Sequence, residues 1–357
     1  GPPVAYPPFS VLLCTKDRPD QLRDTLHSLV RLDYPAFEIV VVDNGPESGL
    51  TPPVVAEFAD QNVRMVPAAR KGLAVARNVG IESARNEFIA FTDDDVLVDR
   101  RWLKNLARGF SRAADVVCVT GMVPTAEVLT PAQSYFDRRV GWASQCQPVV
   151  YDLASPPADD PLFPLRVARF GTGGGQHRVP AVGGALARRL RRRHGGVGSP
   201  TGGGGEDIDM FVRVLLARRT LVYEPGALIW HRHRKSLEEL ETQIYNYGLG
   251  LGAWITKLLL RPRTLGMVVR RGGAGIVHLR SITVVDDPPT VAPTDLKGSV
   301  GSNVAAYSRG AACIAPLPDR RTCGHPASDR AIGSDERSCM SRHRVTVGRF
   351  WAGDPAV

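Results

Sequence analysis

Three consecutive carboxylates, Asp93, Asp94 and Asp95, are the residues of this chain best suited to chemistry. They follow the apolar run Phe88–Phe91, which predicts a buried strand. Carboxylates crowded at the carboxyl end of such a strand repel one another unless a cation lies among them. Mg²⁺ and Mn²⁺ prefer oxygen ligands and share their remaining positions with phosphate oxygens. The triplet, a DXD motif, therefore indicates a metal–diphosphate site, with a solvated acidic turn as the alternative.

Two further predicted strands end beside polar side chains. The apolar run Phe9–Thr15 closes on Thr15, and the run Glu38–Val42 is followed by Asp43. Parallel strands present their carboxyl ends at one edge of a sheet, where the ligands of open α/β folds bind. We therefore expect Thr15, Asp43 and the acidic triplet to lie at one binding edge.

Helical segments separate these strands. Leucines recur at positions 22, 26 and 29, and the run Leu73–Ser83 predicts a second helix, which carries Arg77. A short strand over Val63–Val66 lies between the two helical segments. This alternation predicts an α/β fold with a mostly parallel central sheet and helices on both faces.

A second acidic pair, Glu206 and Asp207, follows four glycines and precedes the helical pattern of Ile208–Arg218. Such glycines free the backbone to bring the pair into a cleft. No Gly-Lys-Ser or Gly-Lys-Thr sequence follows, so a phosphate-binding loop is unsupported. A carboxylate here could take the proton of an attacking hydroxyl. Capping of the helix N-terminus is the alternative, since acids favour that position.

Two histidines at alternate positions, His231 and His233, follow the predicted strand Ala227–Trp230. Neutral imidazole is a common ligand for metals such as Mn²⁺. We expect His231 to be the metal-contacting member of the pair. The intervening and following cations, Arg232 and Arg234, could face a diphosphate leaving group.

The order and spacing of these motifs resemble the nucleotide-binding half of family 2 glycosyltransferases, which are inverting enzymes with the GT-A fold. Each motif is weak alone, and their order makes the signal specific. The matching residues are Cys14–Arg18, Val41–Asn44, Lys71–Gly72, Ala76–Gly80 and Thr92–Asp95.

The resemblance implies a site for a nucleotide-diphosphate sugar. Thr15 and Asp43 would hold the nucleoside, with Asp43 accepting from the base N–H. Arg18 and Arg77 would contact phosphate or ribose, and Asp93 would lie near the ribose. The complete donor-binding set is Thr15, Arg18, Asp43, Lys71, Arg77, Asp93, Asp94 and Glu206.

The resemblance also implies the chemistry. Asp95, with His231, would ligate Mn²⁺ or Mg²⁺ on the diphosphate, and Asp207 would be the catalytic base. The metal would act as a Lewis acid for the departing diphosphate. The expected enzyme is an inverting hexosyltransferase in cell-envelope or secondary-metabolite glycan biosynthesis. Its acceptor, a glycan, a lipid-linked molecule or a small molecule, is not specified by the sequence.

Other functions remain open. A DxDx-type phosphotransferase would use Asp93 or Asp95 as a nucleophile, but that nucleophile normally lies on the first strand. It would also leave Asp43 and Arg77 unexplained. Nucleic-acid binding is permitted by the net charge of +9, but no stacking or groove-reading motif appears, so we expect no nucleic-acid partner.

The segment Gly174–Gly196 favours a third alternative, a non-catalytic or crippled sugar-nucleotide-binding protein. It holds several arginines among glycines without helical or strand period. The resembled family carries a Gly-Ala-Asn-like turn and then Gly-Gly-Phe-Asp-Glu in this place. Back-translation with suitable codons gives both motifs one base downstream. This pattern suggests a compensated frameshift that removes the acceptor-side wall.

The C-terminal part is organised differently. Ser236–Leu260 predicts one long helix, with Ser236 as its cap. Its apolar second half is followed by arginines at 261, 263, 270 and 271, which suits peripheral contact with an anionic membrane. Burial against the core is the alternative. The expected units are 1–121 (nucleotide-sugar-binding half), 122–235 (acceptor and catalytic half), 236–272 (amphipathic helix) and 273–357 (irregular, disordered tail).

Composition bears on the cellular compartment. The chain is 43% apolar and 23% charged, as in ordinary globular proteins. Six scattered cysteines without metal-ligand spacing indicate free thiols in a reducing compartment. We find no signal peptide and no apolar run of the roughly 20 residues that span a bilayer. We therefore expect a cytoplasmic protein that works in solution or at the inner face of the membrane.

Overall fold

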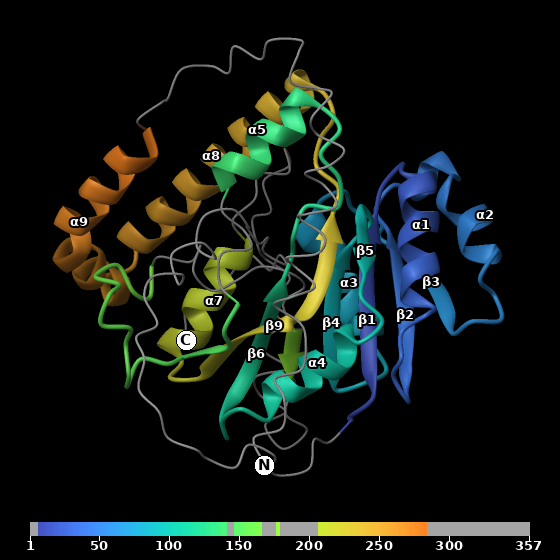
Figure 1. The fold of residues 1–357 in the computed structure, drawn as a ribbon, viewed down its shortest axis with the longest axis horizontal. Coiled ribbons are helices and arrows are strands. Elements are labelled where there is room, and N and C mark those ends of the chain that lie inside the picture. Colours follow the sequence, from blue (N-terminus) through green and yellow to red (C-terminus); the bar gives the residue numbers. More distant parts are fainter. Residues whose placement is uncertain (1–5, 141–145, 166–175, 179–205, 284–357) are drawn as a thin grey trace, which may run out of the picture.

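The computed structural model describes residues 6–140, 146–165, 176–178 and 206–283. These residues form a mixed β-sheet with helices packed against it (Figure 1). The predicted α/β fold with a mostly parallel central sheet is confirmed.

The strands of the described residues join in the order β3-β2-β1-β4-β8-β6-β9-β5, and β7 pairs with β9. β1 to β4 run parallel to one another, as do β6 and β9, whereas β8 and β5 are antiparallel to their neighbours. Their bounds are β1 Phe9–Thr15, β2 Phe37–Asp43, β3 Val63–Pro67, β4 Phe88–Asp93, β5 Val96–Val98, β6 Val116–Met122, β7 Val149–Tyr151, β8 Gln176–Arg178 and β9 Thr220–His231.

The helices begin and end largely where the sequence patterns predict. Pro19 suits the first turn of α1, and Ser236 with Glu239 forms the predicted capping box at the start of α8. The bounds are α1 Pro19–Leu29, α2 Thr51–Ala56, α3 Leu73–Ser83, α4 Trp102–Phe110, α5 Pro131–Val140, α7 Glu206–Leu216, α8 Leu237–Leu259 and α9 Pro262–Thr283, with a short 3₁₀ helix at Pro46–Ser48.

The order of the parallel strands creates a site-forming edge. The chain goes from β1 outward to β2 and β3, and then returns to place β4 on the other side of β1. Ligands of open α/β sheets bind at such a reversal, beyond the carboxyl ends of the strands. The register pairs Thr15 with Asp43 and Cys14 with Asp93 across β1. The predicted gathering of these polar residues at one edge is therefore confirmed.

The core of this half consists of strands buried on both sides. Every residue of β1 is buried, and α3 packs on β1 and β2. A Cβ at Gly80 of α3 would lie 3.0 Å from side-chain atoms of Leu12 and Val42, so glycine lets this helix approach the sheet closely. The rigid packing beneath the edge holds the strand ends in fixed positions.

Strand β9 differs from the sequence-based expectation. The apolar runs Leu221–Tyr223 and Ala227–Trp230 predict two strands around Glu224–Gly226, but they form the single strand β9. Its pairing with β6 changes register after Gly121, where a Cβ would lie 1.9 Å from the carbonyl oxygen of Ala227. The strand therefore continues through Pro225 and Gly226, although this pair predicts a turn, because the irregular pairing accommodates them.

Helix α9 is the other difference. It reaches Thr283, beyond the boundary expected at residue 272. Gly272 and Gly273 favoured that boundary because glycine weakens helices. The strand β8 also lies in the segment that shows no strand period. The rest of the Gly174–Gly196 segment and of the expected 273–357 tail lies outside the described residues.

Candidate active site

The acidic turn joins β4 to β5. β4 ends at Asp93, and Asp94 and Asp95 turn the chain before β5 begins at Val96. The hydroxyl of Thr25, buried on α1, donates to the carbonyl oxygens of Asp94 at 2.9 Å and Val96 at 2.8 Å. Helix α1 therefore fixes the backbone of the turn, and with it the directions of the acidic side chains.

Guanidinium groups lie against the three carboxylates. Arg18 Nη1 lies 3.1 Å from Asp94 Oδ1 and 3.2 Å from Asp95 Oδ2. Arg77, whose side chain is buried on α3, donates to Asp93 at 3.2 Å. Arg18 and Arg77 thus supply part of the positive charge that the acidic triplet requires. The family resemblance assigned both arginines to phosphate or ribose. Their contact with the phosphate or ribose of a donor stays a prediction.

Asp94 links two strand ends. Its Oδ2 accepts a hydrogen bond from the Thr15 hydroxyl at 2.8 Å. Burial and the neighbouring charge of Asp95 raise the pKa of Asp94 to about 6, against the opposing charge of Arg18. Thr15 and Asp94, both predicted to bind the donor, therefore bind each other in this structure.

Asp95 has a different environment, although it is equally buried. Its Oδ1 lies 3.2 Å from Nε2 of His231, and its Oδ2 lies 3.6 Å from Nη1 of Arg234. Burial disfavours its charged form, but His231, Arg234 and Arg18 favour it more strongly and hold the pKa of Asp95 below its ordinary value. Asp95 is thus an ionised carboxylate at neutral pH, as a metal ligand must be.

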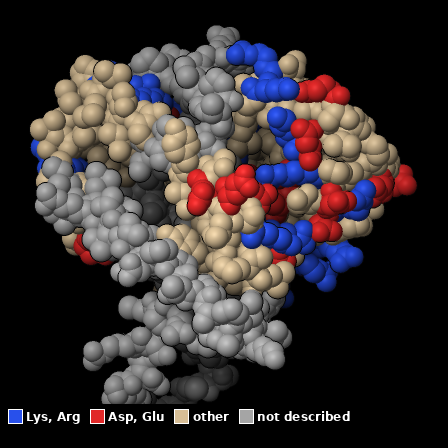
Figure 2. All heavy atoms as spheres, turned by 90° about the horizontal axis from the view of Figure 1, so that it is seen from above, with Lys and Arg blue, Asp and Glu red and all other residues tan. Residues whose placement is uncertain are grey.

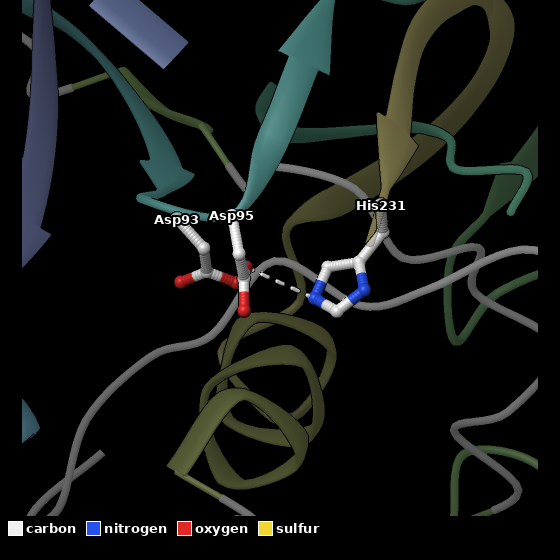
Figure 3. Close-up of side chains that lie close together, drawn as sticks. All are labelled: Asp93, Asp95 and His231. Carbon is white, nitrogen blue, oxygen red and sulfur yellow. Dashed lines mark ion pairs between the residues drawn. The ribbon is translucent and has the colours of Figure 1, made fainter. Parts of the chain in front are cut away.

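Asp93, Asp95 and His231 form a candidate metal centre. One potential ligand atom of each residue lies within 4.8 Å of a potential ligand atom of the other two. Figure 3 shows the two carboxylates and the imidazole ring turned toward a common space, with the ion pair between Asp95 and His231 dashed.

The chemistry of this set fits Mn²⁺ or Mg²⁺. Two carboxylates and one imidazole leave positions free for phosphate oxygens, which such ions commonly take from a substrate.

The basic residues at and after the end of β9 contact different partners. His231 and His233 are buried, and their Nδ1 atoms lie 3.3 Å apart. The Arg234 side chain reaches the acidic turn. The Arg232 side chain does not, because its Nη1 pairs with Asp24 of α1 at 2.6 Å. Of the two arginines considered for a diphosphate, the geometry therefore supports Arg234.

Asp43, which the resemblance assigns to the nucleoside, lies at the end of β2. Asp43 is buried, and its Oδ1 accepts from the amide of Gly45 at 3.0 Å. Asn44 Oδ1 accepts from the amide of Gly72 at 3.2 Å, which ties this turn to the start of α3. Lys71, by contrast, is exposed and pairs with Glu47 at 2.5 Å. The structure thus places Asp43 at the edge and leaves the Lys71 amine in an ion pair outside the acidic cluster.

The predicted base lies at the start of α7. The helix begins at Glu206, so Glu206 and Asp207 open it as expected, but their side chains lie outside the description. Asp209, two positions after Asp207, is buried and accepts from Lys257 of α8 at 2.6 Å. Asp209 therefore anchors α7 to α8, and the base role of Asp207 stays a prediction.

Sequence reasoning missed several residues of the site. Thr25 gave no signal because a threonine inside a helical pattern is usually unremarkable. Thr125 and Asp137 lie in the Pro- and aromatic-rich stretch after β6, from which no residue could be chosen. Thr125 lies against His233 across a separation of 108 residues, and Asp137 accepts a hydrogen bond from Thr125.

Comparison with known proteins is consistent with the resemblance. The model of the family described as "Glycosyl transferase family 2" matches residues 10–151. A pre-mycofactocin glycosyltransferase of Mycobacterium tuberculosis is 27% identical over 239 residues, covering 67% of this chain and 46% of that protein. The putative glycosyltransferase EpsH of Bacillus subtilis is 30% identical over 113 residues, covering 31% of this chain and 33% of EpsH. The chain thus spans less than half the length of these curated relatives.

Two solved structures are similar at lower identity. Staphylococcus aureus TarS 1–349 has a TM-score of 0.46 at 17% identity, covering 71% of this chain and 65% of that one. The mannosyltransferase PcManGT of Pyrobaculum calidifontis, in complex with GDP-Man and Mn²⁺, has a TM-score of 0.46 at 15% identity, covering 87% and 84%.

Proposed function

We propose that this chain, whose residues 10–151 match the model of glycosyl transferase family 2, moves a sugar from a nucleotide-diphosphate donor to an acceptor hydroxyl with inversion. The observation that carries the proposal is the convergence of Asp93, Asp95 and His231 at the carboxyl edge of the parallel strands. Arginines from three separate segments meet the same carboxylates.

The arginines have a second use in this proposal. Arg18, Arg77 and Arg234 now neutralise the acidic turn, and a diphosphate would offer them stronger, bidentate partners. Asp95 and His231, with Asp93 within reach, would hold Mn²⁺ or Mg²⁺ in the place that the arginines give up. When bound, the metal supplies Lewis-acid stabilisation of the departing diphosphate. Donor and metal would therefore bind together and depend on each other.

The acceptor side of the proposal rests on Asp207. Its carboxylate would take the proton of the acceptor hydroxyl as that oxygen attacks the anomeric carbon from the face opposite the nucleotide. Its position at the start of α7 suits a base held on a rigid element. The remaining predicted donor contacts, Thr15, Asp43, Lys71, Asp94 and Glu206, are part of the same proposal.

A donor panel tests the function. The protein is incubated with UDP-, GDP- and dTDP-sugars and Mn²⁺, and nucleotide release and thermal shift are followed. Stabilisation by one donor, dependent on the metal and accompanied by nucleotide release, supports transfer. Stabilisation without any release supports the non-catalytic alternative. Loss of phosphate from phosphoesters, without donor binding, would establish the phosphotransferase instead.

The outer helices support the further proposal that the protein contacts an anionic membrane. At the junction of α8 and α9, Leu260 is 78% exposed and Leu259 is 43% exposed, while Trp254 and Leu258 of the same apolar run are buried. The sequence left burial against the core and contact with a membrane as alternatives for this apolar run. In the structure, one part of the run is buried and another part is exposed. Along α9, Val269 is 67% exposed.

Charge around these apolar residues favours anionic lipid. No acid occurs between Glu241 and Asp286, whereas this interval contains six Lys and Arg residues, at positions 257, 261, 263, 270, 271 and 280. Figure 2 shows both signs of charge interspersed over the N-terminal side, at the right, and mainly uncharged residues toward α8 and α9. No helix of the described residues is long and apolar enough to cross a bilayer, so the proposed contact is peripheral.

A further inference from the structure

A chain of polar groups extends from the candidate metal centre toward α5. Nδ1 of His231 lies 3.3 Å from Nδ1 of His233, and Nε2 of His233 lies 2.9 Å from the hydroxyl of Thr125. That hydroxyl donates a short hydrogen bond to Oδ1 of Asp137 on α5. Four side chains from three segments thus connect the acidic turn to the acceptor-side half.

The chemistry of a ligating imidazole fixes every proton in this chain. If Nε2 of His231 faces the metal and Asp95, its Nδ1 carries the proton and donates to Nδ1 of His233. His233 must then be neutral and protonated on Nε2, which donates to Thr125. The Thr125 hydroxyl in turn donates to Asp137. All donors therefore run in one direction and end on a carboxylate.

The surroundings of His233 hold it in this arrangement. The ring of Phe136, on α5, lies 4.6 Å from the His233 ring between centroids. Gln133 Nε2 donates to the His233 carbonyl oxygen at 3.2 Å. Main-chain hydrogen bonds from His231 N to Pro124 O and from Ala126 N to His231 O, at 2.9 and 2.8 Å, keep Thr125 beside the strand end.

We propose that Thr125, His233 and Asp137 form a positioning relay that fixes the ring orientation and tautomer of His231 for metal binding. The proposal rests on the proposed function, since it assigns these three residues to the same metal centre. It resembles in principle the carboxylate–histidine–metal arrangements in which outer partners set the geometry and basicity of a ligating histidine. Here the carboxylate acts through a threonine and a second histidine.

Removal of one hydroxyl tests the relay. Thr125→Val keeps the side-chain shape and leaves the His233 Nε2–H without its acceptor, whereas Thr125→Ser keeps the hydroxyl. Loss of an outer partner typically lowers metal affinity about 10–100-fold, so we expect Thr125→Val to weaken Mn²⁺ binding by about tenfold or more and Thr125→Ser to restore it. Mn²⁺ binding is measured by electron paramagnetic resonance with the metal alone. Thr120→Val, which removes another buried hydroxyl of the sheet, is the matched control.

Nitrogen-15 NMR of the histidine rings provides a readout that a merely structural role would not change. The wild-type protein should show His233 neutral and protonated on Nε2, and Thr125→Val should lose this single tautomer while its thermal stability matches that of Thr120→Val. A His233 protonated on Nδ1, or wild-type Mn²⁺ affinity in Thr125→Val, would overturn the relay. If the wild-type protein binds neither Mn²⁺ nor donor, the proposed function fails, and the His233 tautomer still decides whether the relay exists.

Discussion

Asp95 and Glu224 are both buried carboxylates paired with arginines, yet their surroundings differ. Glu224, in the middle of β9, is 1% exposed; one oxygen accepts from Arg108 at 2.8 Å and the other from Arg112 at 2.7 Å. Each oxygen has its own guanidinium partner, one from Arg108 on α4 and one from Arg112 just past the end of that helix. Asp95 instead shares Arg18 with Asp94.

The difference lies in the ratio of acids to cations. At Glu224 one carboxylate meets two guanidinium groups and its charge is more than balanced. At the turn, three adjacent carboxylates and an imidazole converge. The positive charge of a bound metal would help to neutralise these carboxylates. Burial and arginine pairing therefore do not mark a binding site by themselves. Carboxylates crowded within reach of an imidazole do, and acid-to-amide substitutions of equal size test the distinction.

The largest effect is expected for a carboxylate outside both groups. Asp207→Asn should lower the transfer rate about 10²–10⁴-fold, because an amide cannot accept the acceptor's proton. Donor affinity should stay near the wild-type value, since the change leaves the acidic turn intact. Single-turnover transfer and isothermal titration with UDP and Mn²⁺ separate the two quantities. Turnover at the wild-type rate would place the base elsewhere.

Asp95→Asn should weaken binding rather than chemistry alone. Loss of one partner from a buried charge cluster costs about 3 kcal/mol or more, which corresponds to roughly 100-fold in the affinity for UDP with Mn²⁺. Isothermal titration with and without the metal measures the change. Asp115→Asn, at an exposed acid paired with Arg219, is the control. Unchanged affinity that still requires metal would remove Asp95 from the ligand set.

Glu224→Gln should show the opposite pattern. The amide keeps the size of the side chain but loses two charge-assisted hydrogen bonds, so the free energy of unfolding should fall by about 1–3 kcal/mol. Chemical denaturation measures this loss, and the affinity for UDP with Mn²⁺ should not change. A stable variant with impaired donor binding would show that the distinction between the two carboxylates is mistaken.

The smallest effect is expected at arginines that no acid of the described residues pairs with, Arg263 and Arg270. Each should contribute about 1 kcal/mol to binding an anionic surface, or about fivefold in partition. Flotation with phosphatidylcholine vesicles, with and without phosphatidylglycerol, compares Arg263→Gln and Arg270→Gln with Arg219→Gln, whose arginine pairs with Asp115.

The apolar part of the same surface has its own matched pair. Leu260→Ser should reduce vesicle binding, whereas Leu237→Ser should not, because Leu237 is 58% exposed at the other end of α8 beside Glu238 and Glu239. Equal loss in both variants would indicate unspecific adsorption. Binding that ignores phosphatidylglycerol would exclude a role for the arginines.

Local sequence patterns were sufficient to predict several elements of the first half of the fold. Phe9–Thr15 and Leu73–Ser83 have the predicted bounds because apolar runs and helical spacing there are bounded by clear turn signals. Parallel pairing then leaves little choice about where the strands end. Thr15, Asp43 and the acidic triplet accordingly lie at one edge, and the expectation needed no knowledge of side-chain contacts.

Only the tertiary structure decided what the side chains at that edge contact. Asp94 turns toward Thr15 and Asp95 toward His231 because Thr25 of α1 fixes the turn between them. His233 finds Thr125 across a separation of 108 residues. Such partners are set by how elements pack, not by local pattern, since residues distant in the sequence meet only when the sheet is assembled.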